Sequence, residues 1–131
     1  MKMLVNCILL FFFSFPLHAD IVTCVADYNE AVKERNNAKG SYQTAINYQR
    51  RAESVSEKKD NKKLYTQSLE WIKVALSNLA RAEKQLDKVK YGGCPDSLIE
   101  NAGSLTSKNF TDRDLYNKMK LSLETKLSLL Q

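Results

Sequence analysis

The cysteines are the residues whose type and spacing point most directly to chemistry in this chain of 131 residues. Cys24 and Cys94 bracket the central part of the sequence, and Cys7 lies in an apolar N-terminal run. If that run is a cleaved export signal, the two remaining thiols are expected to form one disulfide in an oxidising compartment. The only histidine, His18, lies near the same run, so the exported chain would lack the usual general base and metal ligand. The sequence therefore predicts a structural Cys24–Cys94 disulfide, with no catalytic residues and no cofactor or metal site.

Residues 1–19 have the features of a secretory signal peptide. A short basic start is followed by an almost wholly apolar stretch, and Ala19 is a small residue before Asp20. We predict cleavage after Ala19 and a periplasmic or secreted location. An uncleaved anchor is less favoured because the apolar stretch is short for a bilayer. Lipid attachment at Cys24 is also less favoured, because Asp20 interrupts the apolar stretch and Cys94 would lose its partner.

Two rows of residues recur every seven positions between the cysteines, the spacing that keeps side chains on one face of a helix. The first row consists of small residues, Cys24, Ala31, Ala38, Ala45 and Ala52, and the second of large ones, Tyr65, Ile72, Leu79 and Leu86. When the two segments are folded antiparallel, small residues face large ones along the seam and the cysteines meet at one end. The sequence therefore predicts an all-α fold, a long antiparallel helical hairpin over residues 20–94 that is closed at its base by the disulfide.

Turn and capping signals set the expected bounds of the two hairpin helices. The first helix is expected over residues 21–56 and the second over residues 61–90, with a turn near Glu57–Asp60. Asp60 is the candidate N-cap of the second helix. Gly40, inside the first helix, indicates either a bend or a close approach by the second helix.

Residues 95–131 are expected to belong to the same domain, as a loop, a short helix and a C-terminal helix. Pro95 and Gly103 fit the start and the end of the short helix, and residues 104–109 have the composition of a loop.

The C-terminal helix is expected to begin at Thr111. Thr111 with Asp114 approximates a capping box, and Phe110 with Leu115 makes a hydrophobic staple. Such a helix would be roughly 28 Å long. It is therefore expected to pack along the disulfide-closed half of the hairpin and to leave the half near the turn uncovered.

Two groups of residues near the turn are candidates for protein contact. The first is a cluster of cations, Arg50, Arg51, Lys58, Lys59, Lys62 and Lys63, which outnumber the acidic residues of the same segment by six to three. The cluster suits an acidic partner or an anionic head group, and the alternative is a solvated turn rich in lysine. The second group is apolar and lies off the core row of its helix: Leu64, Trp71 and Val74. It indicates a contact or dimer surface, and the alternative is that the C-terminal helix covers it.

Two weaker patterns have alternative interpretations. Tyr28, Tyr42 and Tyr48 on the first helix could stack on sugars or bases, but such spacing more often reflects packing against the core. Asn109-Phe110-Thr111 matches an N-glycosylation acceptor, although Thr111 has the capping role already described.

The charge and the missing catalytic motifs narrow the function classes. Residues 1–19 contain one of the 20 Lys and Arg and none of the 15 Asp and Glu, so the exported chain would carry 19 against 15, or +4. This balance is no indication of nucleic acid as a partner. We predict a non-enzymatic helical protein that acts by contact with another envelope or secreted protein, as an assembly subunit, adaptor or inhibitor, with a homodimer also considered. The alternative is a membrane-active amphipathic protein that contacts a membrane surface.

Overall fold

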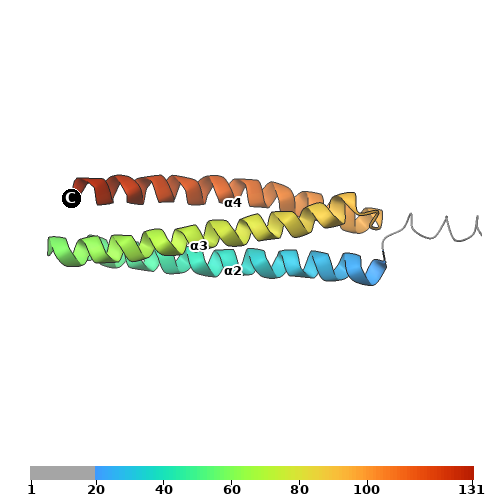
Figure 1. Cartoon of the computed structure of the whole chain (residues 1–131), viewed down its shortest axis with the longest axis horizontal. Coiled ribbons are helices and arrows are strands. Elements are labelled where there is room, and N and C mark those ends of the chain that lie inside the picture. Colours follow the sequence, from blue (N-terminus) through green and yellow to red (C-terminus); the bar gives the residue numbers. More distant parts are fainter. Residues whose placement is uncertain (1–19) are drawn as a thin grey trace, which may run out of the picture.

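The computed structural model describes residues 20–131, which form three long helices lying side by side (Figure 1). Helix α2 spans Ile21–Ser54, α3 spans Lys58–Tyr91 and α4 spans Asp96–Leu129, each with 34 residues. Consecutive helices run antiparallel, so α2 and α4 are parallel. The described residues contain no strand, and the predicted all-α hairpin with a third packed helix is confirmed. The predicted signal peptide lies outside the described residues.

The seam between α2 and α3 buries both predicted rows. The four alanines of the α2 row are fully buried, and Ile72, Leu79 and Leu86 of the α3 row are at most 2% exposed. Hydrogen bonds across the seam fix its antiparallel register, since the Ser68 hydroxyl donates to the carbonyl of Ala45 at 2.6 Å. Small residues on one helix therefore allow the large residues of the other to pack closely.

The turn of the hairpin comes earlier in the chain than predicted. Only three residues, 55–57, separate α2 from α3, so Asp60 lies in the first turn of α3 and is not its N-cap. Asn61, where the second helix was expected to start, donates from Nδ2 to the carbonyl of Ala52 at 2.6 Å. The Asn61 side chain thus satisfies a carbonyl at the end of α2, which allows a shorter connection than the polar composition of the segment suggested.

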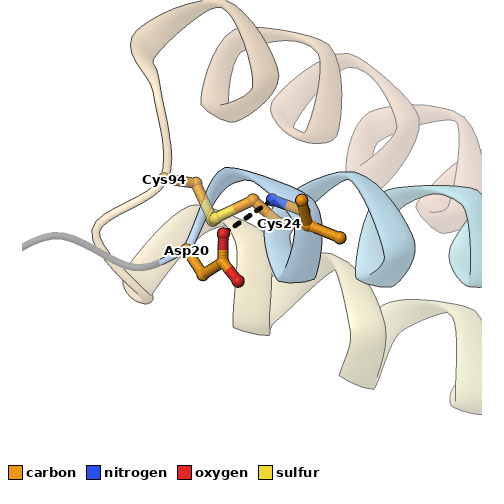
Figure 2. Close-up of a disulfide and its surroundings, with 4 residues drawn as sticks. Asp20, Cys24 and Cys94 are labelled. Atoms are coloured by element: carbon orange, nitrogen blue, oxygen red, sulfur yellow. Dashed lines mark hydrogen bonds between the residues drawn. A yellow bond between two sulfur atoms is a disulfide. The ribbon is translucent and has the colours of Figure 1, made fainter.

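The predicted disulfide joins the first turn of α2 to the connection between α3 and α4 (Figure 2). The Cα atoms of Cys24 and Cys94 are 5.8 Å apart, within the usual range for a disulfide. Gly93 has a φ of 74°, a left-handed conformation that glycine adopts at little cost, and it ends α3 just before Cys94. The disulfide therefore ties the ends of all three helices together at the base of the hairpin.

Helix α4 corrects the expectation of a short helix, a loop and a separate C-terminal helix. It is continuous from Asp96, so Thr111 is an interior residue whose hydroxyl donates to the carbonyl of Ser107 at 3.3 Å, and it forms no capping box. Phe110 and Leu115 are 67% and 47% exposed, so they do not form the predicted staple. Tertiary burial overrides the weak local helix propensity here, since a row with sevenfold spacing runs through the expected loop: Ala102, Asn109, Tyr116 and Leu123.

Helix α4 also reaches the turn half of the hairpin, contrary to the expectation that this half is uncovered. Leu123 is fully buried, and Nζ of Lys126 lies 3.3 Å from a carboxylate oxygen of Glu53 on α2. The same ammonium lies 5.3 Å from the centre of the Tyr65 ring on α3. The third helix is therefore as long as the hairpin and covers one side of it from end to end.

Candidate interaction site

The hairpin presents two sides along its length, and α4 covers only one of them. We call the flank that contacts α4 the covered side, which includes Arg35 and Tyr42 of α2 and Glu83 of α3. The opposite flank is the open side, formed by Ser41 and Tyr48 of α2, by Val55 directly after α2, and by Leu64, Trp71 and Asn78 of α3. On each helix these open-side residues are spaced by seven, so they form one row beside the core row.

The covered side contains a buried polar cluster at mid-length. Arg35 donates from one terminal nitrogen to Oδ1 of Asn109 and from the other to Oδ2 of Asp112 at 3.0 Å. The Asn109 amide also donates to the carbonyl of Leu79 at 3.1 Å, so a single side chain of α4 bonds to both α2 and α3. Among the described residues, no buried side-chain nitrogen or oxygen lacks a hydrogen-bond partner.

Next to this cluster, two tyrosines stack between α2 and α4. The ring centres of Tyr42 and Tyr116 are 4.4 Å apart with an interplanar angle of 19°. Burial raises the pKa of Tyr116 to about 12, and the nearby charge of Asp112 adds to the effect because it opposes a second negative charge. Tyr28, Tyr42 and Tyr48 are all partly buried against the core, which supports the packing interpretation of the tyrosine pattern.

The open side is hollowed near the turn. A groove of about 440 Å³ lies between α2 and α3, and its lining combines apolar, cationic, acidic and uncharged polar side chains. The lining residues are Tyr48, Arg51, Val55, Asp60, Lys63, Leu64 and Gln67. The structure thus brings together one predicted apolar residue and two predicted cations, which come from different helices.

The predicted apolar residues occupy different depths of this side. Leu64 is 9% exposed and lines the groove, so it belongs to the core and is not an exposed anchor. Trp71 and Val74 are 40% and 43% exposed, so the alternative that the third helix covers them is wrong. They continue the apolar surface along α3, one to two helical turns beyond the groove.

The predicted cations surround the turn. All six are exposed, and only Arg51 and Lys63 line the groove, while Arg50, Lys58, Lys59 and Lys62 lie outside the lining. Within residues 20–131, none of the six lies within ion-pair distance of a carboxylate. The guanidinium of Arg51 lies 5.5 Å from the centre of the Tyr48 ring, a favourable cation–π distance.

Towards mid-length the open side becomes polar. The Asn78 amide donates to the Ser41 hydroxyl at 3.4 Å, and Arg81 pairs with Glu34 at 3.2 Å. Arg81 also donates to the Oδ1 atom of Asn78. Polar side chains therefore separate the groove near the turn from a second hollow of about 500 Å³ at the base, which is lined by Asp27, Lys88 and Tyr91 among others.

Sequence reasoning missed two groups of residues. Tyr48 and Val55 in the groove could have been found from their sevenfold spacing with Ser41, one row beside the alanine row. The pairing of Arg35 with Asn109 has no such signal, because it depends on the register of α4. Asn109 is 2% exposed and both polar atoms of its side chain are bonded, so the structure is incompatible with a glycan on this residue.

Residues 20–131 have neither a cluster of metal-ligating side chains nor a helix suited to span a membrane. This part of the chain contains no group of three or more His, Cys, Asp or Glu side chains placed to hold a metal ion. None of its helices has both the length and the apolar character needed to cross a membrane.

The chain matches no protein-family model, and comparison with curated proteins and with solved structures finds no significant similarity. The geometry of the open side is therefore the feature that points to a function.

Proposed function

We propose that this chain is an exported, non-enzymatic contact protein that binds another envelope or secreted protein through the turn half of its open side. The observation that carries the proposal is the exposed pair of Trp71 and Val74 beside a groove between two helices. Tryptophan is enriched at the centres of protein interfaces, and here it is the only one in the chain. The proposal includes no catalytic step.

The surroundings of the apolar pair resemble the plan of a protein interface. An apolar centre is bordered by polar and charged side chains, including Arg51, Lys63 and Gln67. The disulfide supports the export part of the proposal, because such bonds persist mainly in oxidising compartments. The role as assembly subunit, adaptor or inhibitor depends on the partner.

Site-specific photo-crosslinking tests the proposal in cells of the source organism. A photoreactive phenylalanine analogue replaces Trp71 in one variant and Leu115 in a control variant, since these positions are 40% and 47% exposed. We expect a discrete adduct with another protein from position 71 and none from position 115. No adduct from position 71, or the same adducts from both positions, would contradict the proposal.

A second experiment separates protein contact from the membrane-active alternative. Purified residues 20–131, as the wild-type sequence or with Trp71→Ala, are immobilised and used to capture proteins from an envelope extract. The wild-type protein is also added to anionic lipid vesicles, and leakage is measured. We expect capture that depends on Trp71 and vesicles that stay intact. If Trp71→Ala leaves every captured protein and the oligomeric state unchanged, the contact proposal fails, and leakage would support the membrane-active protein.

A further inference from the structure

The two sides of the hairpin have the same plan, although only one holds a helix. On the covered side, the half near the turn is aromatic and apolar, and Tyr42 packs there against the core. The middle of the same side is polar and contains Arg35 and Glu83. On the open side, the turn half has Tyr48 and Trp71, and mid-length has Ser41 and Asn78. A pair of long helices offers a groove on each side into which a further helix can pack.

We infer that the open side binds an amphipathic helix of the partner protein, with acidic residues along its flanks, and that this helix completes a four-helix arrangement opposite α4. The inference rests on the proposed function and specifies its partner. Helix α4 shows what such a groove accepts, since it places Tyr116 and Leu123 in the turn half and Asn109 at mid-length. The incoming helix should likewise have apolar residues facing Trp71 and Leu64, and a polar residue facing Asn78.

The cations of the turn favour acidic flanks on the incoming helix. Arg51 and Lys63 line the groove from α2 and α3, one on each wall. The segment 50–63 carries six cations against three acidic residues, a net charge of +3, and its cations are unpaired within residues 20–131. Acidic residues on the partner would pair with these cations and speed the encounter of the two proteins.

A second copy of this chain fits the open side poorly in either orientation. A parallel dimer would bring two turn segments of net charge +3 together, which is repulsive. An antiparallel dimer that overlaps along the full length of the open side would place Trp71 and Val74 of one copy near the polar half of the other, where Glu34 and Arg81 are paired. The charge and the polarity of the open side therefore favour a different protein as the occupant.

A peptide titration tests the inference, with Trp71 as the reporter because the chain has no other tryptophan. The probe is a synthetic peptide of about 14 residues, four helical turns, without tryptophan, with leucine at helical spacing and glutamate on both flanks. One control peptide carries lysine in place of every glutamate, and another has the same composition in an order without an apolar stripe. Oxidised residues 20–131 are titrated, and binding is measured by Trp71 fluorescence and by calorimetry.

The matched variants are Val74→Glu on the open side and Leu115→Glu on α4, at positions that are 43% and 47% exposed. Circular dichroism confirms that both variants remain helical before the titration. We expect the acidic peptide to bind wild type with a dissociation constant of roughly 10–100 µM and a blue shift of the Trp71 emission. Val74→Glu should weaken binding by about tenfold or more, and Leu115→Glu by less than about twofold.

Three results would overturn the inference: no saturable binding up to about 1 mM, equal binding by both variants, or binding of the scrambled peptide as tight as that of the probe. If the lysine peptide binds as tightly as the acidic peptide or more tightly, the inference that the partner helix has acidic flanks is wrong. The two proposals fail separately. If photo-crosslinking from position 71 captures a protein while no helical peptide binds, the contact function stands and the helical mode of binding is wrong.

Discussion

The seam between α2 and α3 and the seam that holds α4 differ in what they bury. The hairpin seam consists mainly of alanine against larger apolar residues, with three uncharged polar residues, Ser41, Ser68 and Asn78, and it is tied at both ends, by a three-residue turn and by the disulfide. The α4 seam contains Arg35, Asn109 and Tyr116, and α4 is tied only at its base. We infer that the apolar seam supplies most of the stability, and that the polar seam determines the register of α4.

The largest predicted effect is the loss of the covalent tie at the base of the hairpin. The disulfide links residues 70 apart, and in the chain-entropy model its removal costs about 4 kcal/mol. The double variant Cys24→Ser/Cys94→Ser should lose about this much stability in urea unfolding, measured against the oxidised wild type. A loss below about 1 kcal/mol would mean that the apolar seam holds the hairpin without the disulfide.

The polar seam should be the next most sensitive region. Arg35→Ala leaves Oδ1 of Asn109 without its partner in a buried site and removes the ion pair with Asp112, so we expect a loss of about 2 kcal/mol. Arg81→Ala on the open side is the matched control, since that side chain is 56% exposed and should cost about 0.5 kcal/mol. Hydrogen exchange should show the loss mainly in α4. Equal losses for the two variants would contradict a special role of the buried cluster.

Alkaline pH should weaken the α4 seam through Tyr116. The folded state holds the pKa of this phenol at about 12 against an ordinary value of 10, so folding favours its protonated form. The stabilisation is fully present below pH 10 and is lost as the pH rises through 12, by about 2 kcal/mol. Urea unfolding from pH 9 to 12 should therefore decline more steeply for wild type than for Tyr116→Phe. Parallel profiles would contradict the burial of Tyr116, and Tyr91→Phe at an exposed position is the control.

The smallest predicted effects are gains from two helix-interior glycines. A Cβ added at Gly40 or at Gly103 would meet no heavy atom within 4 Å, so neither glycine is required by a close approach. Gly40→Ala and Gly103→Ala should each stabilise the protein by about 0.5–1 kcal/mol in thermal or urea unfolding. The gain at Gly103 should appear mainly in the protection of α4 amides. Gly92→Ala is the contrasting variant and should destabilise, because its Cβ would lie 2.3 Å from the carbonyl oxygen of Lys88.

The same contrast explains which parts of the fold could be predicted from sequence. The alanine row and the Leu79 row repeat at sevenfold spacing, and this local pattern was sufficient for the hairpin and its disulfide. In α4 the local signals conflict, because Gly103, Ser107 and Asn109 are weak helix formers that resemble a loop. That stretch is helical because Ala102 and Asn109 are buried against the hairpin, so composition alone indicated the wrong start of the helix.

The candidate site was predictable to the same limited degree. Trp71 and Val74 lie off the core row, so the sequence left them either as a contact surface or under the third helix, and the structure leaves them 40% and 43% exposed. The burial of Leu64 and the presence of Tyr48 and Val55 in the groove depend on the register of α2 against α3. The turn sets this register, and a turn placed a few residues later would change it. Predicting a groove between two helices therefore requires the register of the helices as well as the spacing of their apolar residues.

Light scattering after size-exclusion chromatography of oxidised residues 20–131 tests most directly the central claim that the open side is free to bind a different protein. We predict the mass of a monomer at all protein concentrations from about 1 µM to 1 mM. Weak dimers with dissociation constants in this range would be detected. The contradicting result is a dimer that Val74→Glu abolishes and Leu115→Glu leaves intact. That result would show that the open side binds a second copy of the chain.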